Sequence, residues 1–367
     1  MNIKSSVSKF QEQLRIIWAI AAKDITDAIR NKVIWQAALS IGLIMVLYKA
    51  LPAVTGISAL PHVTVYDEGD AILTVYLANS SNVETRIVSS RQDMAFFVAM
   101  ESMPELGLII PDDFDRALAS GEPLKLDGYV QHWVSDARAE ALKRQIEREI
   151  SDQLARPVDI DLVGHRVYPR LDGFGPHTWA ATSIIMVLAI VGLNLTPQLM
   201  IEEKQARTVD VLLTSPATSR HIVAGKALAG LVYCLTGIAV VLAFNAAMVT
   251  RWDLIIPATL CGTLLAVALG LLLGVMLDTR QSLKLWELGL TLVFVVPVIM
   301  SGMAIDLPPA VNTAVRYFPP AALGRLFLIA MSDSAPLAEI AIDLTVTLIP
   351  AGIILIVLAR QISCSDR

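Results

Sequence analysis

Three polar side chains lie within long apolar stretches of the sequence, where a polar group needs a partner. They are Asn194, Asn245 and Asp343, and Glu287 and Glu339 lie near or within the last two stretches. An asparagine there can bond to a neighbouring helix, and a charge inside a bilayer is costly enough to suggest a function. Asp343 comes early in the last stretch, so it lies either in the bilayer or at the headgroups. We take Asn194, Asn245 and Asp343 as a candidate intramembrane polar site, although no chain of ionisable groups for a proton or ion relay is visible.

A charged stretch, EEKQARTVDVLLTSPATSRHIVAGK, separates two of the apolar stretches. If it begins as a helix, Val209, Leu212 and Leu213 share one face and charged residues surround them. A serine and a proline, Ser215 and Pro216, then break the helix and start a short turn. A knob with a small apolar face and a charged rim favours a protein partner. The alternative is a helical turn that lies on lipid.

Residues that could bind a metal ion or act as a nucleophile are scattered. The histidines of the soluble part, His62, His132 and His165, lack metal-ligand spacing, so a zinc site there would need tertiary proximity. The acidic run 112–115 resembles a cation cluster, but it also suits the start of a helix. The sequence contains no GxSxG nucleophile motif and no GxxxxGK[ST] nucleotide-binding loop. We therefore predict that the chain is not an enzyme and that it binds no metal or cofactor of its own.

The elements that must position these residues are membrane helices. The 367 residues are 55% hydrophobic and only 17% charged, which is too apolar for an ordinary soluble protein. The predicted spans are residues 33–54, 177–200, 222–249, 254–277, 287–304 and 337–360. No small-residue cleavage motif follows the first span, so we expect it to be retained. Residues 305–336 contain two Pro-Pro pairs and are predicted to form an outer re-entrant or interfacial hairpin.

The first 32 residues contain a helix with one apolar face, and its charged residues, including Asp24, lie on the other side. The apolar residues are Leu14, Ile17, Trp18, Ala21, Ile25 and Ile29. This pattern is typical of an amphipathic helix on the inner membrane surface. The alternative is a soluble helix that packs on a partner.

Residues 55–176 alternate between strand and helix patterns, which predicts a small α/β domain inserted between the first two spans. The expected strands are residues 62–67, 84–90, 105–111, 124–133 and 158–168. The expected helices are residues 71–80, 92–102, 112–121 and 135–155, the last one capped by Ser135. This insertion has a net charge of −9, with 20 acidic and 11 basic residues, whereas the remainder has +4. No clustered basic face is present, which argues against a nucleic-acid partner.

The distribution of Lys and Arg predicts the orientation of the chain. The N-terminal segment, residues 201–226, the next alternate loop and the C-terminus together contain 14 of these residues, whereas the short loops on the other side contain three. The positive-inside rule then places both termini in the cytoplasm and the insertion 55–176 outside.

The order E-K-x-x-R-T-V-D-V-L-L-T-S-P … R-x-I-V-A-G-K resembles the signature loop of ABC-2 type transporter permeases. WAIAAKDITDAIRNK is similar to the elbow helix of that family. VTVYDEGD and ELGLIIPDDFDRALASGE are similar to the outer domain of its drug- and sodium-export-like branch, and VRYFPPAALGRLFL is similar to the outer hairpin before the last span. The resemblance covers the whole chain. The family usually has glycine where this chain has Arg207.

The resemblance implies a helical membrane fold with six spans and an extracytoplasmic α/β domain. Residues 1–32 would be the elbow helix, and residues 201–221 would be a coupling helix seated on a separate ABC ATPase, which binds ATP and magnesium. The coupling residues would be Glu203, Lys204, Arg207, Thr208, Asp210, Leu212, Leu213, Ser215, Pro216, Arg220 and Lys226. Two permease copies, or a copy and a paralogue, would enclose an export path among the lipids of the bacterial plasma membrane.

Two other functions remain open on the sequence alone. The chain could be a membrane-anchored sensor or scaffold whose outer domain binds a ligand, or an intramembrane enzyme. Six spans without a cytoplasmic output domain disfavour the first, and the lack of a polar constellation disfavours the second. The cargo cannot be identified, but the uncharged central spans favour an amphipathic or lipid-like molecule.

Overall fold

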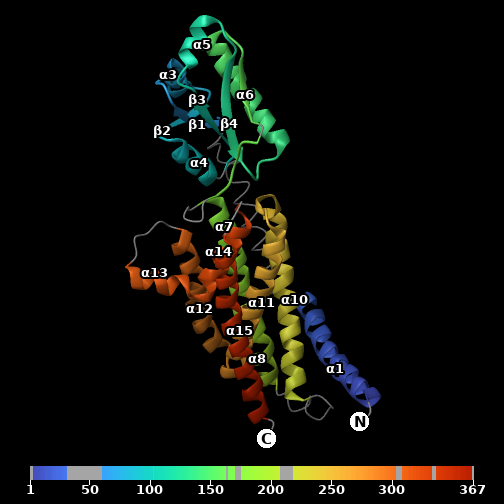
Figure 1. The fold of residues 1–367 in the computed structure, drawn as a ribbon. Coiled ribbons are helices and arrows are strands. Elements are labelled where there is room, and N and C mark those ends of the chain that lie inside the picture. Colours follow the sequence, from blue (N-terminus) through green and yellow to red (C-terminus); the bar gives the residue numbers. More distant parts are fainter. Residues whose placement is uncertain are drawn as a thin grey trace.

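The computed structural model describes residues 3–30, 60–101, 103–162, 164–169, 175–206, 218–302, 308–332 and 336–365. These residues form a sheet domain stacked on one end of a helical bundle (Figure 1). Both ends of the chain lie at the opposite end of the bundle, far from the sheet domain. The predicted first span, residues 33–54, lies outside the described residues.

The sheet domain contains a six-stranded mixed sheet. Its strands are β1 (His62–Asp67), β2 (Glu84–Val88), β3 (Glu105–Ile110), β4 (Leu124–Gln131), β5 (Val158–Asp161) and β6 (Arg166–Val167). The order is β2-β1-β3-β4-β5, and β6 also pairs with β4. The β3–β4 pair is antiparallel, whereas the other pairs are parallel. The small α/β domain expected from the alternating patterns is therefore present, and its sheet is mixed.

Helices cover both faces of this sheet (Figure 1). They are α3 (Ile72–Asn79), α4 (Arg91–Met100), α5 (Phe114–Ser120) and α6 (Asp136–Leu154). Alternate residues of β1 and β3, such as Val65 and Leu108, pack against α3, α5 and α6 in the larger core. Helix α4 packs on the other face, where Met94 and Val98 contact Ile109 in a smaller core.

The expected single strand at 158–168 is wrong, because two short strands occupy this range. Residue Asp127 of β4 pairs with Asp161, and Val130 pairs with Arg166, so β4 advances three residues while its partner advances five. Between the two strands, the backbone N–H of His165 donates to the carbonyl oxygen of Leu162 at 3.3 Å, and Gly164 has a φ of +76°, which suits glycine. Such an insertion cannot be read from alternation alone.

The bundle contains five helices that are long and apolar enough to cross a membrane, counted among the described residues. The first is a continuous rod made of α7 (Pro176–Ile190), a π-helical turn (Val191–Leu195) and α8 (Thr196–Ala206). The others are α10 (Ser219–Asn245, extended by a 3-10 turn at Ala246–Met248), α11 (Trp252–Met276), α12 (Arg280–Gly302) and α15 (Leu337–Ser365). Their positions agree with the predicted spans, except that α12 begins seven residues before the predicted start at 287.

Two short helices lie in the predicted hairpin region. Helix α13 (Pro309–Arg316) is almost entirely exposed and projects from the side of the bundle (Figure 1). Helix α14 (Pro319–Ala330) is almost entirely buried among the long helices. Its end is held by the turn between α10 and α11, since the backbone N–H groups of Thr250 and Arg251 donate to the carbonyl oxygen of Ala330 at 3.1 and 3.0 Å.

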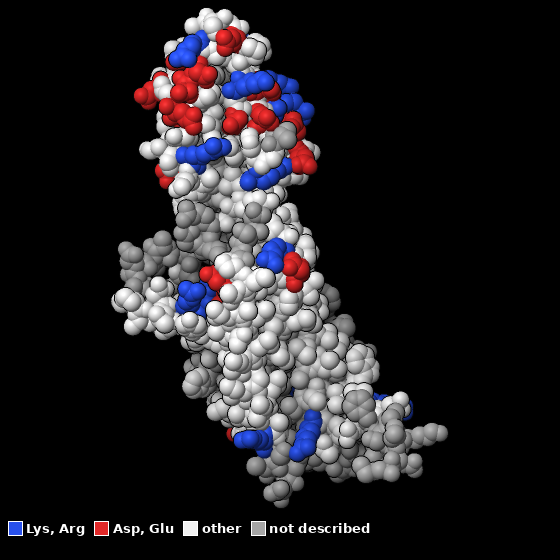
Figure 2. Space-filling view, viewed as in Figure 1, with Lys and Arg blue, Asp and Glu red and all other residues white. Residues whose placement is uncertain are grey.

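Charge is distributed unevenly between the two parts. Figure 2 shows acidic and basic side chains gathered over the sheet domain, while the visible face of the bundle has few of them between its two ends. Apolar side chains such as Leu285, Leu288 and Ile356 are exposed on that bundle. An uncharged apolar surface of this extent is what a bilayer requires.

Candidate functional site

A polar group lies inside the bundle where α12 contacts the rod formed by α7 and α8. The amide of Asn194 donates a hydrogen bond to the carboxylate of Glu287, and the amide of Gln198 donates to the side-chain oxygen of Asn194. All three side chains are half-buried. Asn194 therefore bonds to another helix, and its partner there is a carboxylate.

The π-helical turn Val191–Leu195 contains Asn194. A π turn inside an α-helix is rare and often marks a functional position, because it leaves backbone groups out of the regular ladder. Behind it, the rod packs very closely on α11, since a side chain on Gly270 would overlap the carbonyl oxygen of Gly192. This contact holds the turn in place, so that Asn194 is presented to α12 from a rigid support.

Asp343 lies inside the protein and forms an ion pair with Arg325. The guanidinium of α14 meets this carboxylate of α15 through two bonds, with Nη2–Oδ1 at 2.6 Å and Nε–Oδ2 at 3.2 Å. Arg325 also donates to the carbonyl oxygen of Arg316, at the end of α13. Asn245 behaves differently from our expectation, because its buried amide donates at 2.9 Å to Val241 of its own helix. The predicted intramembrane residues thus do not form a single site.

At the end of the bundle far from the sheet domain, α8 is tied to the junction of α11 and α12. Lys204 Nζ donates to the carbonyl oxygens of Val275 and Leu277, at 2.6 and 3.3 Å, and to the carboxylate of Asp278 at 3.1 Å. The lysine thereby satisfies carbonyl groups left open at the end of α11. Glu202 forms an ion pair with Arg280 at 2.9 Å. Movement of the end of α8 would therefore pull on both α11 and α12.

Lys226, one of the expected coupling residues, is buried. Its ammonium pairs with the carboxylate of Asp24 at 3.3 Å, and only 1% of the lysine side chain is exposed. The Tyr233 hydroxyl donates to the backbone carbonyl of Asp24 at 2.6 Å. Helix α1 (Ile3–Arg30) and α10 approach closely here, because Gly225 leaves room for Ile20.

This contact corrects the predicted faces of α1. Asp24 was expected on the charged side, but it lies with Ile17, Ile20 and Ala21 on the face that packs against α10. Leu14 and Trp18 are exposed instead. These four residues are spaced by three, four and seven positions, so the sequence also allows them to share one helix face. Only the position of α10 shows that this face, and not the one with Leu14 and Trp18, packs inward.

Most of the expected coupling residues lie outside the described residues. They are Arg207, Thr208, Asp210, Leu212, Leu213, Ser215 and Pro216. Glu203 belongs to α8, and Arg220 lies in the first turn of α10 with an exposed side chain. Their coupling role remains a prediction.

At the junction of the sheet domain and the bundle, His132 makes contacts that the sequence did not reveal. His132 Nε2 lies 3.1 Å from the carbonyl oxygen of Met248, which can only accept, so this nitrogen carries the proton. The ring stacks between Tyr168 and His177, with ring centres 4.9 and 5.2 Å away. Burial lowers the pKa of His132, which favours the neutral ring.

The other candidate metal ligands are occupied elsewhere. His165 stacks on Tyr129, and His62 lies 3.5 Å from Glu84. Asp115 lies in the first turn of α5, as the helix interpretation of residues 112–115 expects, and it also accepts from the backbone N–H of Ile72 at the start of α3. Within the described ranges, no group of three or more His, Cys, Asp or Glu side chains could hold a metal ion.

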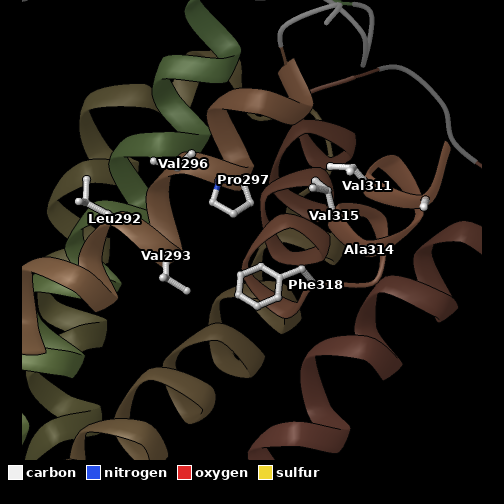
Figure 3. Close-up of a pocket in the computed structure, with 9 residues that line it drawn as sticks. Leu292, Val293, Val296, Pro297, Val311, Ala314, Val315 and Phe318 are labelled. Atoms are coloured by element: carbon white, nitrogen blue, oxygen red, sulfur yellow. The ribbon is translucent and has the colours of Figure 1, made fainter. Parts of the chain in front are cut away.

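An apolar groove lies between α12 and α13 (Figure 3). It has a volume of about 680 Å³, and its lining is entirely apolar. The lining residues are Leu292, Val293, Val296, Pro297, Ala310, Val311, Ala314, Val315 and Phe318. Such a lining accommodates hydrocarbon and contains no polar side chain that would orient a polar ligand.

Sequence reasoning missed Gln198, Asp24 and Arg325 as partners. Gln198 follows Asn194 by four residues, a spacing that places both on one helix face and could have revealed it. Asp24 and Arg325 have no such local signal, because their partners lie 202 and 18 residues away in the sequence.

Comparison with known proteins agrees with this architecture. No curated protein and no solved structure matches the chain. The family model of the ABC-2 family transporter proteins matches residues 33–360. This match includes the sheet domain and all five long bundle helices through most of α15. Multiple apolar helices, a mixed α/β domain before them and this match together show that the chain is a multi-pass membrane protein belonging to the ABC-2 transporter family.

Proposed function

We propose that the chain is the permease subunit of an ATP-driven exporter, in which a separate ABC ATPase acts on residues 201–221. The observation that carries this proposal is the family match over residues 33–360. Members of this family generally pair with an ABC ATPase and typically lack an ATPase domain of their own. The absence of a GxxxxGK[ST] loop from the sequence is consistent with that division of labour.

The contacts at the end of α8 support a mechanical role for the adjoining loop. Lys204 and Glu202 connect this end to the α11–α12 junction through the contacts with Asp278 and Arg280. The rod continues through α7 without a break to the end of the bundle nearest the sheet domain. A force applied to residues 201–221 would therefore reach α11, α12 and the polar group around Asn194.

The proposed orientation places both termini and residues 201–221 in the cytoplasm of a bacterial cell and the sheet domain outside the plasma membrane. Two features support it. The excess of Lys and Arg lies in the segments assigned to the cytoplasm. Both chain ends lie at the end of the bundle opposite the sheet domain (Figure 1). Two permease copies, or one copy and a paralogue, would then enclose the path.

The test is co-purification with an ABC ATPase, together with ATP hydrolysis by the captured complex. Replacing Leu212 and Leu213 by alanine removes the apolar anchors of the predicted coupling face. Losing two central anchors typically weakens binding about tenfold or more. The matched control is Leu285→Ala with Leu288→Ala, a leucine pair that is 77% and 69% exposed on α12.

The control pair should leave association with the ATPase unchanged. Equal association and equal ATP hydrolysis in the Leu212/Leu213 variant would exclude the coupling role of this loop. A chain that purifies from native membranes without any ABC ATPase would instead favour the sensor or scaffold alternative.

A further inference from the structure

Glu287 differs from the other described acidic residues of the bundle because no described basic side chain lies beside it. Every other described acidic side chain between residues 176 and 365 lies within 4.0 Å of a basic side chain. The pairs are Glu202–Arg280, Asp253–Arg251, Asp278–Lys204, Glu339–Arg316 and Asp343–Arg325. Among the described residues, Glu287 has an amide partner, Asn194, but no such basic partner. Lys284 lies one turn earlier on the same helix and is exposed, yet it makes no ion pair with Glu287 within that distance.

Glu287 also lies within the apolar part of the bundle. It is seven residues after Arg280, which places it about 10 Å along the helix from the charged end of the bundle. A carboxylate in such surroundings is costly unless a cation or several hydrogen bonds stabilise it. The relay from Gln198 through Asn194 supplies one hydrogen bond to this carboxylate. The half-buried side chain remains accessible to a further partner.

We propose that Glu287, positioned by Asn194 and Gln198, binds the positively charged group of the transported molecule, an organic monocation with a large apolar body. This assignment rests on the proposed transport function and names its cargo class. Apolar residues one turn away on the same face of α12 provide the apolar part of the surface. They are Leu283, which is buried, and Leu290, which is half-buried. A single carboxylate within such a surface complements a molecule that has one charge and much hydrocarbon.

The side chains at this position favour an organic cation over a metal ion. Calcium takes six to eight oxygen ligands and magnesium six. The group has one carboxylate and two amide oxygens, and one of these, Oδ1 of Asn194, already accepts a hydrogen bond from Gln198. An ammonium or phosphonium centre needs only a carboxylate and apolar contacts, which this position has.

The experiment measures binding of tetraphenylphosphonium to the full chain in nanodiscs of uncharged lipid, with empty nanodiscs subtracted. Tetraphenylborate, which has a similar shape and the opposite charge, is the matched probe. Glu287→Gln should weaken tetraphenylphosphonium binding about tenfold or more, since a charged contact is lost. Glu287→Asp keeps the charge and should retain most of the binding. Glu339→Gln removes a carboxylate that already has Arg316 as partner, and it should change nothing.

Three results would overturn the proposal. The first is equal tetraphenylphosphonium affinity in the wild-type and Glu287→Gln chains. The second is an equal loss of tetraphenylborate binding in that variant. The third is displacement of tetraphenylphosphonium by sodium chloride but not by choline chloride at equal concentration, which would assign Glu287 to an inorganic ion. Binding is measured without the ATPase, so a failure here is distinct from a failure of ATPase association, which tests the proposed function.

Discussion

The sheet domain and the helical bundle use their polar residues in opposite ways. In the sheet domain, apolar side chains fill the cores on both faces of the sheet, and nearly all charges lie on the surface (Figure 2). In the bundle, the outer surface is apolar, and charged side chains such as Lys226 and Asp343 are inside. Each of these two pairs with a residue of another helix.

The difference follows from the solvent that each part meets. Water drives apolar side chains into the core of the sheet domain, so hydrophobic burial selects which face of each helix packs inward. Lipid is as apolar as leucine, so burial makes little distinction between the inner and outer faces of a bundle helix. Ion pairs and close contacts at small residues then decide which helix faces meet.

The strongest test of this comparison removes one partner of the buried pair between α1 and α10. Lys226→Met leaves the Asp24 carboxylate buried without its cation, which should destabilise the protein by about 3–5 kcal/mol. Unfolding of the full chain in detergent would measure the change.

Two controls sharpen the test. The double variant Asp24→Leu with Lys226→Met removes both charges and should recover most of the stability. Lys23→Met, at an exposed position of α1, should have little effect. If Lys226→Met alone is as stable as the wild type, the buried pair does not hold α1 against α10.

The corresponding change in the sheet domain removes apolar volume. Leu108 is completely buried in β3, and Leu108→Ala should cost about 2–5 kcal/mol through lost burial and a cavity. Protease digestion of the full chain in urea, followed on fragments of the sheet domain, would measure this. Ile87→Ala on β2, at a position 53% exposed, is the control and should cost much less. Similar costs at both positions would contradict the assignment of the core.

A smaller, pH-dependent effect on the stability of the sheet domain is expected at Glu105, a charged residue that is buried there. Glu105 is 1% exposed, it accepts from the hydroxyl of Thr64, and Arg86 lies 3.9 Å away. Burial raises the pKa of Glu105 in the folded state, although Thr64 and Arg86 oppose the shift.

The sign of the pH dependence follows from that shift. The folded domain holds the proton more tightly than the unfolded chain, so this residue contributes stability at acidic pH that is lost as the pH rises through its raised pKa. Glu105→Gln should remove this dependence and make the domain more stable at neutral pH. The same protease measurement from about pH 4, near the ordinary glutamate pKa, up to about pH 8 checks it. A wild-type domain that becomes more stable as the pH rises over this range would contradict the prediction.

The sequence was most informative where a local pattern has a single physical outcome. The pattern of HVTVYD and the apolar run ELGLII predicted strands that the structure contains, and the apolar stretch 254–277 predicted α11 almost to the residue. The family resemblance, carried by short motifs in the right order, agrees with the match over residues 33–360. Its coupling motif contains residues 207–217, which lie outside the described residues.

Local patterns were less informative at boundaries and irregular turns. The start of α12 was predicted too late, because Lys284 and Glu287 lower the hydrophobicity of its first turns without breaking the helix. The interruption between β5 and β6 was missed because alternation continues on either side of it. The π turn around Asn194 has no signal in composition at all.

By itself, the sequence determined that this chain crosses a membrane, contains an α/β domain before its later spans and belongs with the ABC-2 permeases. These properties depend on local periodicity, on total hydrophobicity and on motifs that are contiguous in the chain. Only the tertiary structure decided that Asp24 meets Lys226, that Arg325 meets Asp343, and that Glu287 meets an amide. The physical reason is that a charge in an apolar helix must find a partner, but its own neighbours in sequence do not say on which helix that partner lies.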